Sequence, residues 1–199
     1  MTLIFVRHGE SEGNVLGVAQ GWADYALTKR GRRQAEAVAD HLAGRQPVAL
    51  YSSDLVRAVA TADVIASRLG LSVERREGLR EQCFGERQGL TWEQCVERWG
   101  DGLVVGDGKV PGEEQTVAFR ERVAAEFEAL SERHREDVVV CVAHGGTILA
   151  VVAHVLGLDA GHYPALRLAN GSLTVVEVER GQPAITALNH DRHLRGLEG

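Results

Sequence analysis

Apolar residues gather in short runs along the 199-residue chain. Residues 3–6 (LIFV), 48–52 (VALYS) and 138–143 (VVVCVA) are rich in aliphatic side chains, a pattern typical of strands that are covered on both faces in a parallel sheet. Two later runs, 172–179 (SLTVVEVE) and 184–189 (AITALN), flank the letters RGQP. They predict a hairpin or a pair of late strands.

Helical spacing appears between and after these runs. Three predicted apolar helix faces are Ala35, Val38, Ala39 and Leu42; Leu55, Val59, Ala62, Ala66 and Leu69; and Phe119, Val123, Phe127 and Leu130. Residues 147–158 (TILAVVAHVLGL) are apolar nearly all round and predict a buried helix. Strands that alternate with helices predict an α/β fold, here a three-layer sandwich with a mainly parallel central sheet and helices on both faces.

Residues 77–113 fit this alternation least well. They are rich in glycine and hold Trp92 and Trp99. We expect an irregular insertion around one short helix, of the kind that often forms one wall of a ligand site. No linker or abrupt change of composition divides the rest of the chain, so residues 1–199 predict a single domain.

The charge balance narrows the class of partner. With 22 Lys and Arg against 28 Asp and Glu, the formal net charge is −6, so neither nucleic acid nor an anionic membrane is expected as a partner. No run reaches about 18 apolar residues, and Arg7 interrupts the short N-terminal one, so no signal peptide or membrane span is predicted. Three cysteines without a CxxC pair suit reduced thiols. We expect a cytoplasmic protein.

Polar side chains follow each of the three predicted parallel strands. In an open α/β sheet, ligands bind beyond the carboxyl ends of the strands, where these side chains would meet. The groups that follow the strands are Arg7 and His8; Ser52, Ser53 and Arg57; and His144, Gly145 and Gly146. Their joint occurrence at three strand ends is the strongest functional signal in the pattern.

This set of residues suits phosphate chemistry. Two arginines can present bidentate forks to phosphate oxygens, and a glycine-rich turn before a helix exposes backbone N–H groups to an anion. A neutral imidazole is a competent nucleophile and an imidazolium can stabilise charge. Glu81 is the candidate general acid, with Glu86 and Glu77 as alternatives. Spacing alone leaves open which histidine is the nucleophile.

Four blocks in this order carry a resemblance: RHGES with Asn14, SSDLVRAVATA with Arg57, LREQCFGERQGLTW with Glu81, and VAHGG with His144. Together they resemble the histidine phosphatase superfamily, which has the phosphoglycerate-mutase-like fold. Residues 27–40 (LTKRGRRQAEAVAD) and 170–177 (NGSLTVVE) also resemble blocks of this family. The likeness covers nearly the whole chain.

The resemblance implies a role for each matching residue. His8 would attack phosphorus and become phosphohistidine, while Glu81 would protonate the leaving group and then activate water. The residues that would bind the phosphoryl group or the substrate are Arg7, Asn14, Gln20, Gly21, Arg57, Glu81, His144 and Gly145. Neither a metal nor another cofactor is needed in that scheme.

Within the family, the short insertion favours hydrolysis of a small phosphorylated metabolite over mutase activity. Only 29 residues separate Glu81 from Pro111, and the chain resembles the broad-specificity and α-ribazole phosphatases of bacteria. One departure is the stretch PGEEQTVAFRERV (111–123) in place of the GGES block that relatives often carry, which weakens any transfer of substrate from them.

Three alternatives stay open. The first is a phosphoglycerate mutase, and the second is a module that binds a phosphorylated ligand without turnover, which we would expect to lack His8 or Glu81. The third is a metal-dependent hydrolase with ligands at His190 and His193. An edge strand near the C-terminus also leaves room for a homodimer.

Overall fold

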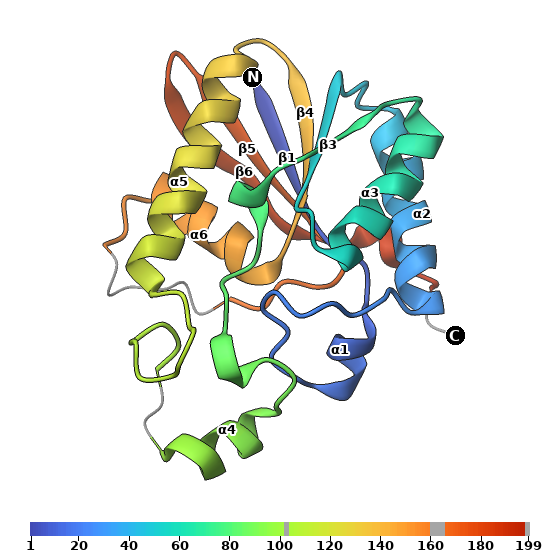
Figure 1. Ribbon diagram of the computed structural model, residues 1–199. Coiled ribbons are helices and arrows are strands. Elements are labelled where there is room, and N and C mark those ends of the chain that lie inside the picture. The colour runs from blue at the N-terminus through green and yellow to red at the C-terminus, as the bar shows by residue number, and fades with distance from the viewer. Residues whose placement is uncertain (102–103, 160–165, 198–199) are drawn as a thin grey trace.

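The computed structural model describes residues 1–101, 104–159 and 166–197, and a six-stranded sheet lies at its centre (Figure 1). The strand order is β3-β2-β4-β1-β5-β6. The strands are β1 (Thr2–Arg7), β2 (Ala49–Ser52), β3 (Val73–Arg75), β4 (Val138–Ala143), β5 (Leu173–Glu179) and β6 (Gln182–His190). The first four run parallel, whereas β5 is antiparallel to β1 and forms a hairpin with β6.

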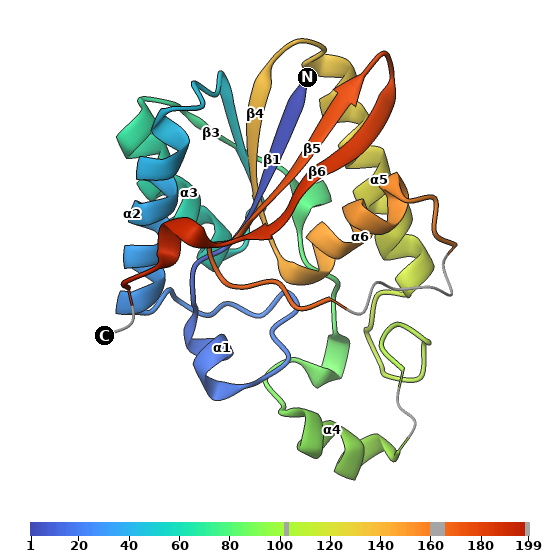
Figure 2. The ribbon, with the colours of Figure 1, turned by 180° about the vertical axis from the view of Figure 1, so that it is seen from behind.

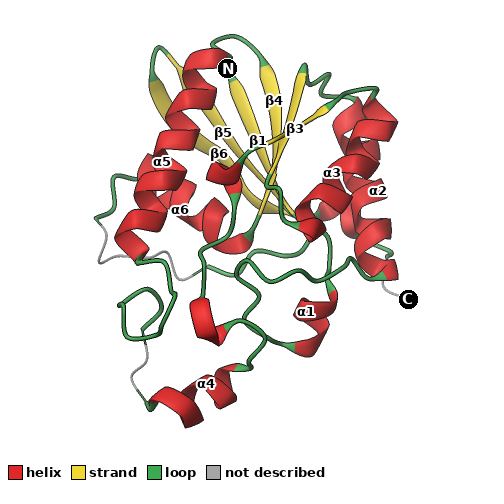
Figure 3. Ribbon diagram, in the orientation of Figure 1, coloured by secondary structure: helices red, strands yellow, loops and turns green. Residues whose placement is uncertain are grey.

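Helices cover both faces of this sheet (Figures 2 and 3). The α-helices are α1 (Glu12–Leu16), α2 (Lys29–Ala43), α3 (Val56–Leu69), α4 (Trp92–Trp99), α5 (Thr116–Arg133) and α6 (Gly145–Val155). Three 3-10 turns are η1 (Glu77–Leu79), η2 (Gly85–Arg87) and η3 (Arg192–Leu194). Because α2 and α3 pack on one face and α5 and α6 on the other, the predicted three-layer α/β sandwich is confirmed.

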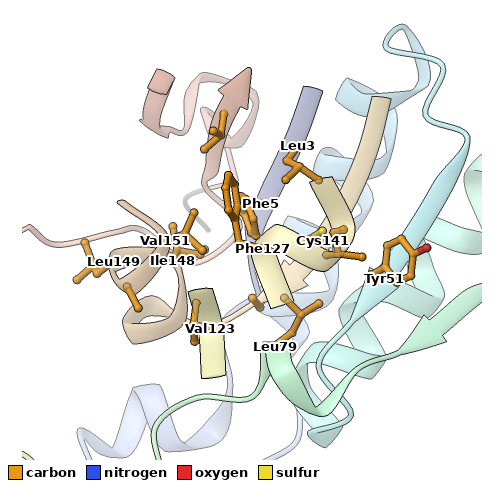
Figure 4. Close-up of a cluster of buried hydrophobic side chains, with 14 of the residues drawn as sticks. Leu3, Phe5, Tyr51, Leu79, Val123, Phe127, Cys141, Ile148, Leu149 and Val151 are labelled. Atoms are coloured by element: carbon orange, nitrogen blue, oxygen red, sulfur yellow. The ribbon is translucent and has the colours of Figure 1, made fainter. Parts of the chain in front are cut away.

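The central strand β1 explains why its sequence is apolar without alternation. Successive side chains of a strand point to opposite faces. Leu3 and Phe5 belong to the core cluster under α5 and α6, which Figure 4 shows, whereas Ile4 and Val6 belong to the cluster under α2 and α3. All four are at most 1 % exposed. A strand between two helical layers therefore needs apolar residues at every position.

The predicted helix over 147–158 has different ends. It begins at Gly145, directly after the extended residue His144, and stops at Val155. Leu156 is 59 % exposed, and Gly157 has a φ of +65°, a left-handed conformation that ends an α-helix. The residues after Val155 are therefore as apolar as those of the helix, but they are neither helical nor buried.

Two short elements were not predicted. Strand β3 has three residues, and its middle and last residues are exposed, so no apolar run marks it. Helix α1 has five residues and depends on its ends: Ser11 and Asn14 form a capping box, and Gly17 follows with a φ of +67°. Neither element carries the hydrophobic periodicity on which prediction relied.

Of residues 77–113, the parts around η2 and α4 lie below the carboxyl ends of the parallel strands in Figure 1, together with α1. The whole segment contains α4 and the 3-10 turns η1 and η2. Thr91 caps α4 by accepting a bond from the Gln94 N–H, and Gln94 bonds back to the Thr91 N–H. This segment therefore covers the edge of the sheet at which a ligand is expected.

Across the described residues, no helix combines the length and apolarity that crossing a bilayer requires.

Candidate active site

The carboxyl ends of β1, β2 and β4 bring the predicted site residues together. β1 pairs in parallel with β4 up to its last residue, Arg7, so His8 and His144 follow at the same edge of the sheet. Their ring centroids lie 5.1 Å apart. Ser53, which follows β2, bonds through its side-chain oxygen to His144 Nε2 at 2.8 Å. The three clusters of polar residues thus meet at one rim.

The environment of His8 defines its protonation. Its Nδ1 lies 2.7 Å from the Gly9 carbonyl oxygen, and Arg57 Nε–H donates to its Nε2 at 3.3 Å. A carbonyl only accepts and a guanidinium only donates, so Nδ1 carries the proton and Nε2 a lone pair. Burial, followed by the charges of Arg57 and Arg7, holds the pKa of His8 well below 6.5. His8 is therefore a neutral imidazole that can act as a nucleophile at Nε2.

The two histidines differ in access. His8 lines a cavity of about 460 Å³, whereas His144 is completely buried and is not among the lining residues. Among the described residues, His144 Nδ1 has no hydrogen-bond partner. Burial, followed by the charge of Arg57, holds the pKa of His144 well below 6.5. The geometry therefore distinguishes the two histidines by their access to the cavity, which spacing alone did not.

Both predicted arginines lie in the wall of this cavity. Arg57 is 1 % exposed and donates to the carbonyl oxygens of Gly21 at 2.7 Å and Ala23 at 3.0 Å. Burial lowers the pKa of Arg57 to about 10, so it stays charged. Arg7 donates to the Leu168 carbonyl, while its buried Nε has no hydrogen-bond partner within the part of the chain that is described. An incoming oxyanion can accept that hydrogen.

Asn14, Gln20 and Gly21 also line the cavity, as expected of substrate-binding residues. The Asn14 Oδ1 accepts a bond from Asn170 Nδ2 at 3.1 Å, so Nδ2 is the Asn14 atom that can donate to a ligand oxygen. Gly21 contributes through its carbonyl, which holds Arg57 in place. Asn170 also donates to the His8 carbonyl at 3.1 Å. It was not predicted, although it opens the block NGSLTVVE.

Glu81 faces the same cavity from the segment that follows η1. Its Oε2 accepts the Gly146 N–H at 2.9 Å, in the first turn of α6. A Cβ on Gly146 would lie 2.2 Å from Glu81 Oε1, so this contact requires glycine. The Gly146 N–H, expected to face a bound anion, instead binds this carboxylate, while Gly145 lines the cavity as predicted. The carboxylate therefore lies against the phosphate site.

The two alternative acids lie elsewhere. Glu86 pairs with Arg98 at 2.5 Å on the surface, and Glu77 has a side chain that is 77 % exposed. Neither lines the cavity. Of the three glutamates, the structure places only Glu81 where it can exchange a proton with a substrate in this cavity.

A family model of the histidine phosphatase superfamily (branch 1) matches residues 3–191. The chain belongs to this superfamily. The predicted family is thereby confirmed, and the four sequence blocks that suggested it are the ones whose residues line the cavity or support it.

Curated relatives match over nearly full length. Phosphoserine phosphatase 1 of Hydrogenobacter thermophilus is 32 % identical over 96 % of this chain and 93 % of its own. Glucosyl-3-phosphoglycerate phosphatase of Mycobacterium tuberculosis is 38 % identical over 86 % and 83 %. Among solved structures, Bacillus stearothermophilus YhfR superposes with a TM-score of 0.88 at 25 % identity, over 97 % of this chain and 98 % of that one.

One of the two predicted subgroups, the α-ribazole phosphatases, and the mutase alternative are both represented among the matches. The α-ribazole phosphatase of Shigella flexneri superposes with a TM-score of 0.86 at 26 % identity, over 95 % of this chain and 96 % of that chain. A probable phosphoglycerate mutase of Salmonella paratyphi C is 33 % identical over 92 % of this chain and 87 % of its own. The superfamily members most similar to this chain therefore include phosphatases and a probable mutase.

Arg122 is a support of the site that sequence reasoning missed. It extends from α5 and donates to the carbonyl oxygens of Gly78 and Arg80 at 3.1 Å and of Glu81 at 3.3 Å. The same guanidinium pairs with Glu114 at 2.8 Å. Glu114 stands where this chain departs from the family's GGES block, so that departure is tied structurally to the backbone that carries Glu81.

Trp22 holds the same backbone from the other side. Its Nε1–H donates to the Glu81 carbonyl at 2.7 Å, and its ring lies under the Arg80 guanidinium, 4.8 Å from ring centroid to Cζ. No local signal identifies this contact, because 57 residues lie between Trp22 and Arg80.

His190 and His193, the residues of the metal-hydrolase alternative, stack with each other at 5.9 Å between centroids. His41 of α2 joins them, with its ring centroid 5.1 Å from that of His193. Across the residues that the structure describes, no group of three or more His, Cys, Asp or Glu side chains is arranged to hold a metal ion. None of these three histidines lines the cavity that holds His8.

Proposed function

We propose that the protein is a phosphomonoester hydrolase that works through a phosphohistidine at His8. The observation that carries the proposal is the pair of contacts to the His8 ring, which leave a lone pair on Nε2 inside a cavity lined by Arg7 and Arg57. A neutral nucleophile beside two fixed cations suits a phosphate dianion, because the cations attract it without protonating the imidazole.

In the first half-reaction, the Nε2 lone pair attacks phosphorus and the P–O bond to the alcohol breaks. Glu81, entering this step as the carboxylic acid, gives its proton to the departing oxygen. Arg7 and Arg57 stabilise the charge on the phosphoryl oxygens. By comparison with the loss of one oxyanion donor, each of them contributes about 2.7–4 kcal/mol to transition-state binding.

In the second half-reaction, water attacks the same phosphorus. The Glu81 carboxylate takes a proton from that water, the P–N bond breaks, and its electron pair returns to His8 Nε2. Inorganic phosphate leaves, and Glu81 is again the carboxylic acid. Every atom in this cycle comes from substrate, water and the side chains of the cavity.

The substrate class is a small phosphorylated metabolite. A cavity of about 460 Å³ suits such a molecule. The short insertion between Glu81 and Pro111 favours water as the acceptor over a second substrate hydroxyl, so the mutase reaction is the second candidate. A cytosolic location is supported by three unpaired cysteines, Cys83, Cys95 and Cys141. Pairing of two copies along the edge strand β6 stays a prediction.

The test measures phosphate release in excess chelator from p-nitrophenyl phosphate, phosphoserine, α-ribazole phosphate and 3-phosphoglycerate. We expect release from wild type and from His154→Ala, a matched control whose histidine is remote from the cavity, and none from His8→Ala. Incubation with ³²P-labelled substrate followed by alkaline quench should label wild type and His154→Ala but not His8→Ala, with a label that acid removes.

Three results would overturn the proposal. Turnover near wild type in His8→Ala would remove His8 from the mechanism. Isomerised phosphoglycerate without release of phosphate would establish the mutase, and binding of esters without either product would establish the non-catalytic module.

A further inference from the structure

A second cavity of about 700 Å³ adjoins the one that holds His8. The two cavities share the wall residues Glu81, Phe84 and Gly146. Glu81 is the residue that would protonate the departing alcohol, so a phosphate group seated against Arg7 and Arg57 would direct its alcohol toward this shared wall. The second cavity therefore lies on the leaving-group side of the site.

Its lining is mostly apolar, and the described residues that form it carry no positive charge. Phe84, Val104, Val105 and Val117 supply the apolar surface, and Val104 and Val117 are 59 % and 50 % exposed. Among the described residues that line it, the charged ones are Glu81 and Asp107, and none is Arg, Lys or His. Exposed apolar side chains that gather beside a catalytic group are typical of a ligand site.

The wall that presents the valines is held by specific bonds. Thr116 Oγ1 donates to the Val105 carbonyl at 2.9 Å, and the Thr116 N–H donates to the Gly106 carbonyl at 3.2 Å. Arg87 donates to the Val104 carbonyl at 2.9 Å. These bonds attach both ends of the wall, 104–106, to neighbouring segments.

Gly106 shows how close this attachment is. Its φ is +75°, and a Cβ there would lie 2.1 Å from Thr116 Oγ1 and 2.5 Å from Gln82 Nε2. The position therefore requires glycine on two grounds, backbone conformation and space. The backbone that carries Val104 and Val105 is therefore held in a fixed position at the cavity.

Resting on the proposed function, we propose that this cavity binds the alcohol portion of the substrate and that this portion is neutral and apolar, an alkyl or aryl group. A carboxylate on the alcohol, as in phosphoserine or 3-phosphoglycerate, would face Glu81 and Asp107. Lys109 already pairs with Asp107 at 2.8 Å and is not a lining residue, and the described residues of the lining include no cation. The negative charge and the apolar surface of the cavity thus both favour esters of uncharged, apolar alcohols.

The experiment uses n-alkyl phosphates from ethyl to hexyl, together with ω-carboxyalkyl phosphates of matched length. The acidity of the alcohol hardly changes along the longer alkyl chains, so each ester needs proton donation from Glu81 to the same extent. Differences in kcat/KM within the series therefore report binding of the alkyl chain. We expect kcat/KM of wild type to rise about three- to fourfold per methylene until the cavity is filled. The carboxylated partner of each ester should be the poorer substrate.

Val117→Asp and Val117→Lys test whether these preferences arise in the second cavity. We expect Val117→Asp to flatten the chain-length dependence and Val117→Lys to reduce the discrimination against the carboxylated esters. The matched control is Val48→Asp, which replaces an equally exposed valine, 56 % exposed, at the opposite end of β2. It should retain the dependence of wild type.

The outcomes separate the two proposals. Hydrolysis of all esters without dependence on chain length, or a dependence that Val117→Asp leaves intact, overturns the apolar site while the hydrolase stands. Absence of hydrolysis with every ester overturns the proposed function and this inference with it.

Discussion

The catalytic rim, formed by the residues that follow β1, β2 and β4, and the insertion at 77–113 both contain a buried arginine. At the rim, Arg57 bonds to two carbonyls and to His8, and among the described residues no carboxylate forms an ion pair with it. In the insertion, Arg87 pairs with Glu113 at 3.4 Å, with side chains 2 % and 0 % exposed.

The difference separates two uses of a buried charge. A cation without a carboxylate partner costs free energy in the empty protein, and a phosphate dianion can offset that cost when it binds. A cation neutralised by its own glutamate has no such capacity and serves to hold a segment in place. The two arginines thus have different uses: Arg57 is available to a bound phosphate, whereas Arg87 supports the substrate wall.

The largest expected effect concerns Glu81, the acid that the insertion places at the rim. Glu81→Gln keeps the bond from Gly146 but cannot give a proton, so hydrolysis of alkyl phosphates should fall about 10²–10⁴-fold. For p-nitrophenyl phosphate, whose alcohol leaves without a proton, the first half-reaction should change little, which pre-steady-state release of nitrophenol measures. Equal slowing of that step for alkyl and aryl esters would assign the acid elsewhere.

Removal of the paired arginine should act on stability. Arg87→Met leaves Glu113 buried without a partner, and we expect the free energy of unfolding to fall by about 3–5 kcal/mol. Urea denaturation measures it. The double variant Arg87→Met with Glu113→Leu should recover most of the loss. A single variant as stable as wild type would show that the pair does not hold the insertion.

Removal of the unpaired arginine should act on catalysis. We expect Arg57→Ala to lower kcat/KM by about 10²–10³-fold, equivalent to about 2.7–4 kcal/mol of transition-state binding. Its free energy of unfolding should fall far less than that of Arg87→Met. If only KM changed, Arg57 would bind the ground state and the transition state equally.

The smallest expected effect is on the pH dependence of stability. The pKa of His8 lies well below 6.5 in the folded protein because of burial and then Arg57, so below pH 6.5 the unfolded chain binds a proton that the folded one does not. The contribution of His8 to the free energy of unfolding is therefore fully present above pH 6.5. It is lost as the pH falls below 6.5, by up to about 1.4 kcal/mol per pH unit.

Denaturation of wild type and His8→Asn between pH 7.5 and 5 isolates the contribution of His8. His144 shows the same direction of shift but is present in both proteins. The His8→Asn profile should be the flatter one by up to that slope. Parallel profiles would mean that His8 is protonated alike in the folded and unfolded states.

Prediction succeeded where structure follows from local pattern. The apolar runs correctly predicted β1, β2 and β4. The polar residues that follow these strands lie at one edge of the sheet, because parallel strands end at the same side. Prediction failed for β3 and α1, whose few residues carry no periodicity, and for the end of α6, where Leu156 matches the helix in composition but not in burial. Arg122 and Trp22 were missed because their contacts join distant segments.

The order of apolar runs and the residues that follow them predicted, without coordinates, the fold class and the meeting of Arg7, His8, Arg57 and His144, while the resemblance of four sequence blocks identified the family and favoured Glu81. Only the tertiary structure shows how these side chains are held. The bond from Arg57, together with the adjacent Gly9 carbonyl, gives His8 its tautomer. Packing of distant segments buries His144, brings Glu81 rather than Glu77 or Glu86 to the cavity, and joins Val104 to Val117 in one apolar wall. A sequence specifies such contacts only through packing, since each depends on where segments far apart along the chain meet.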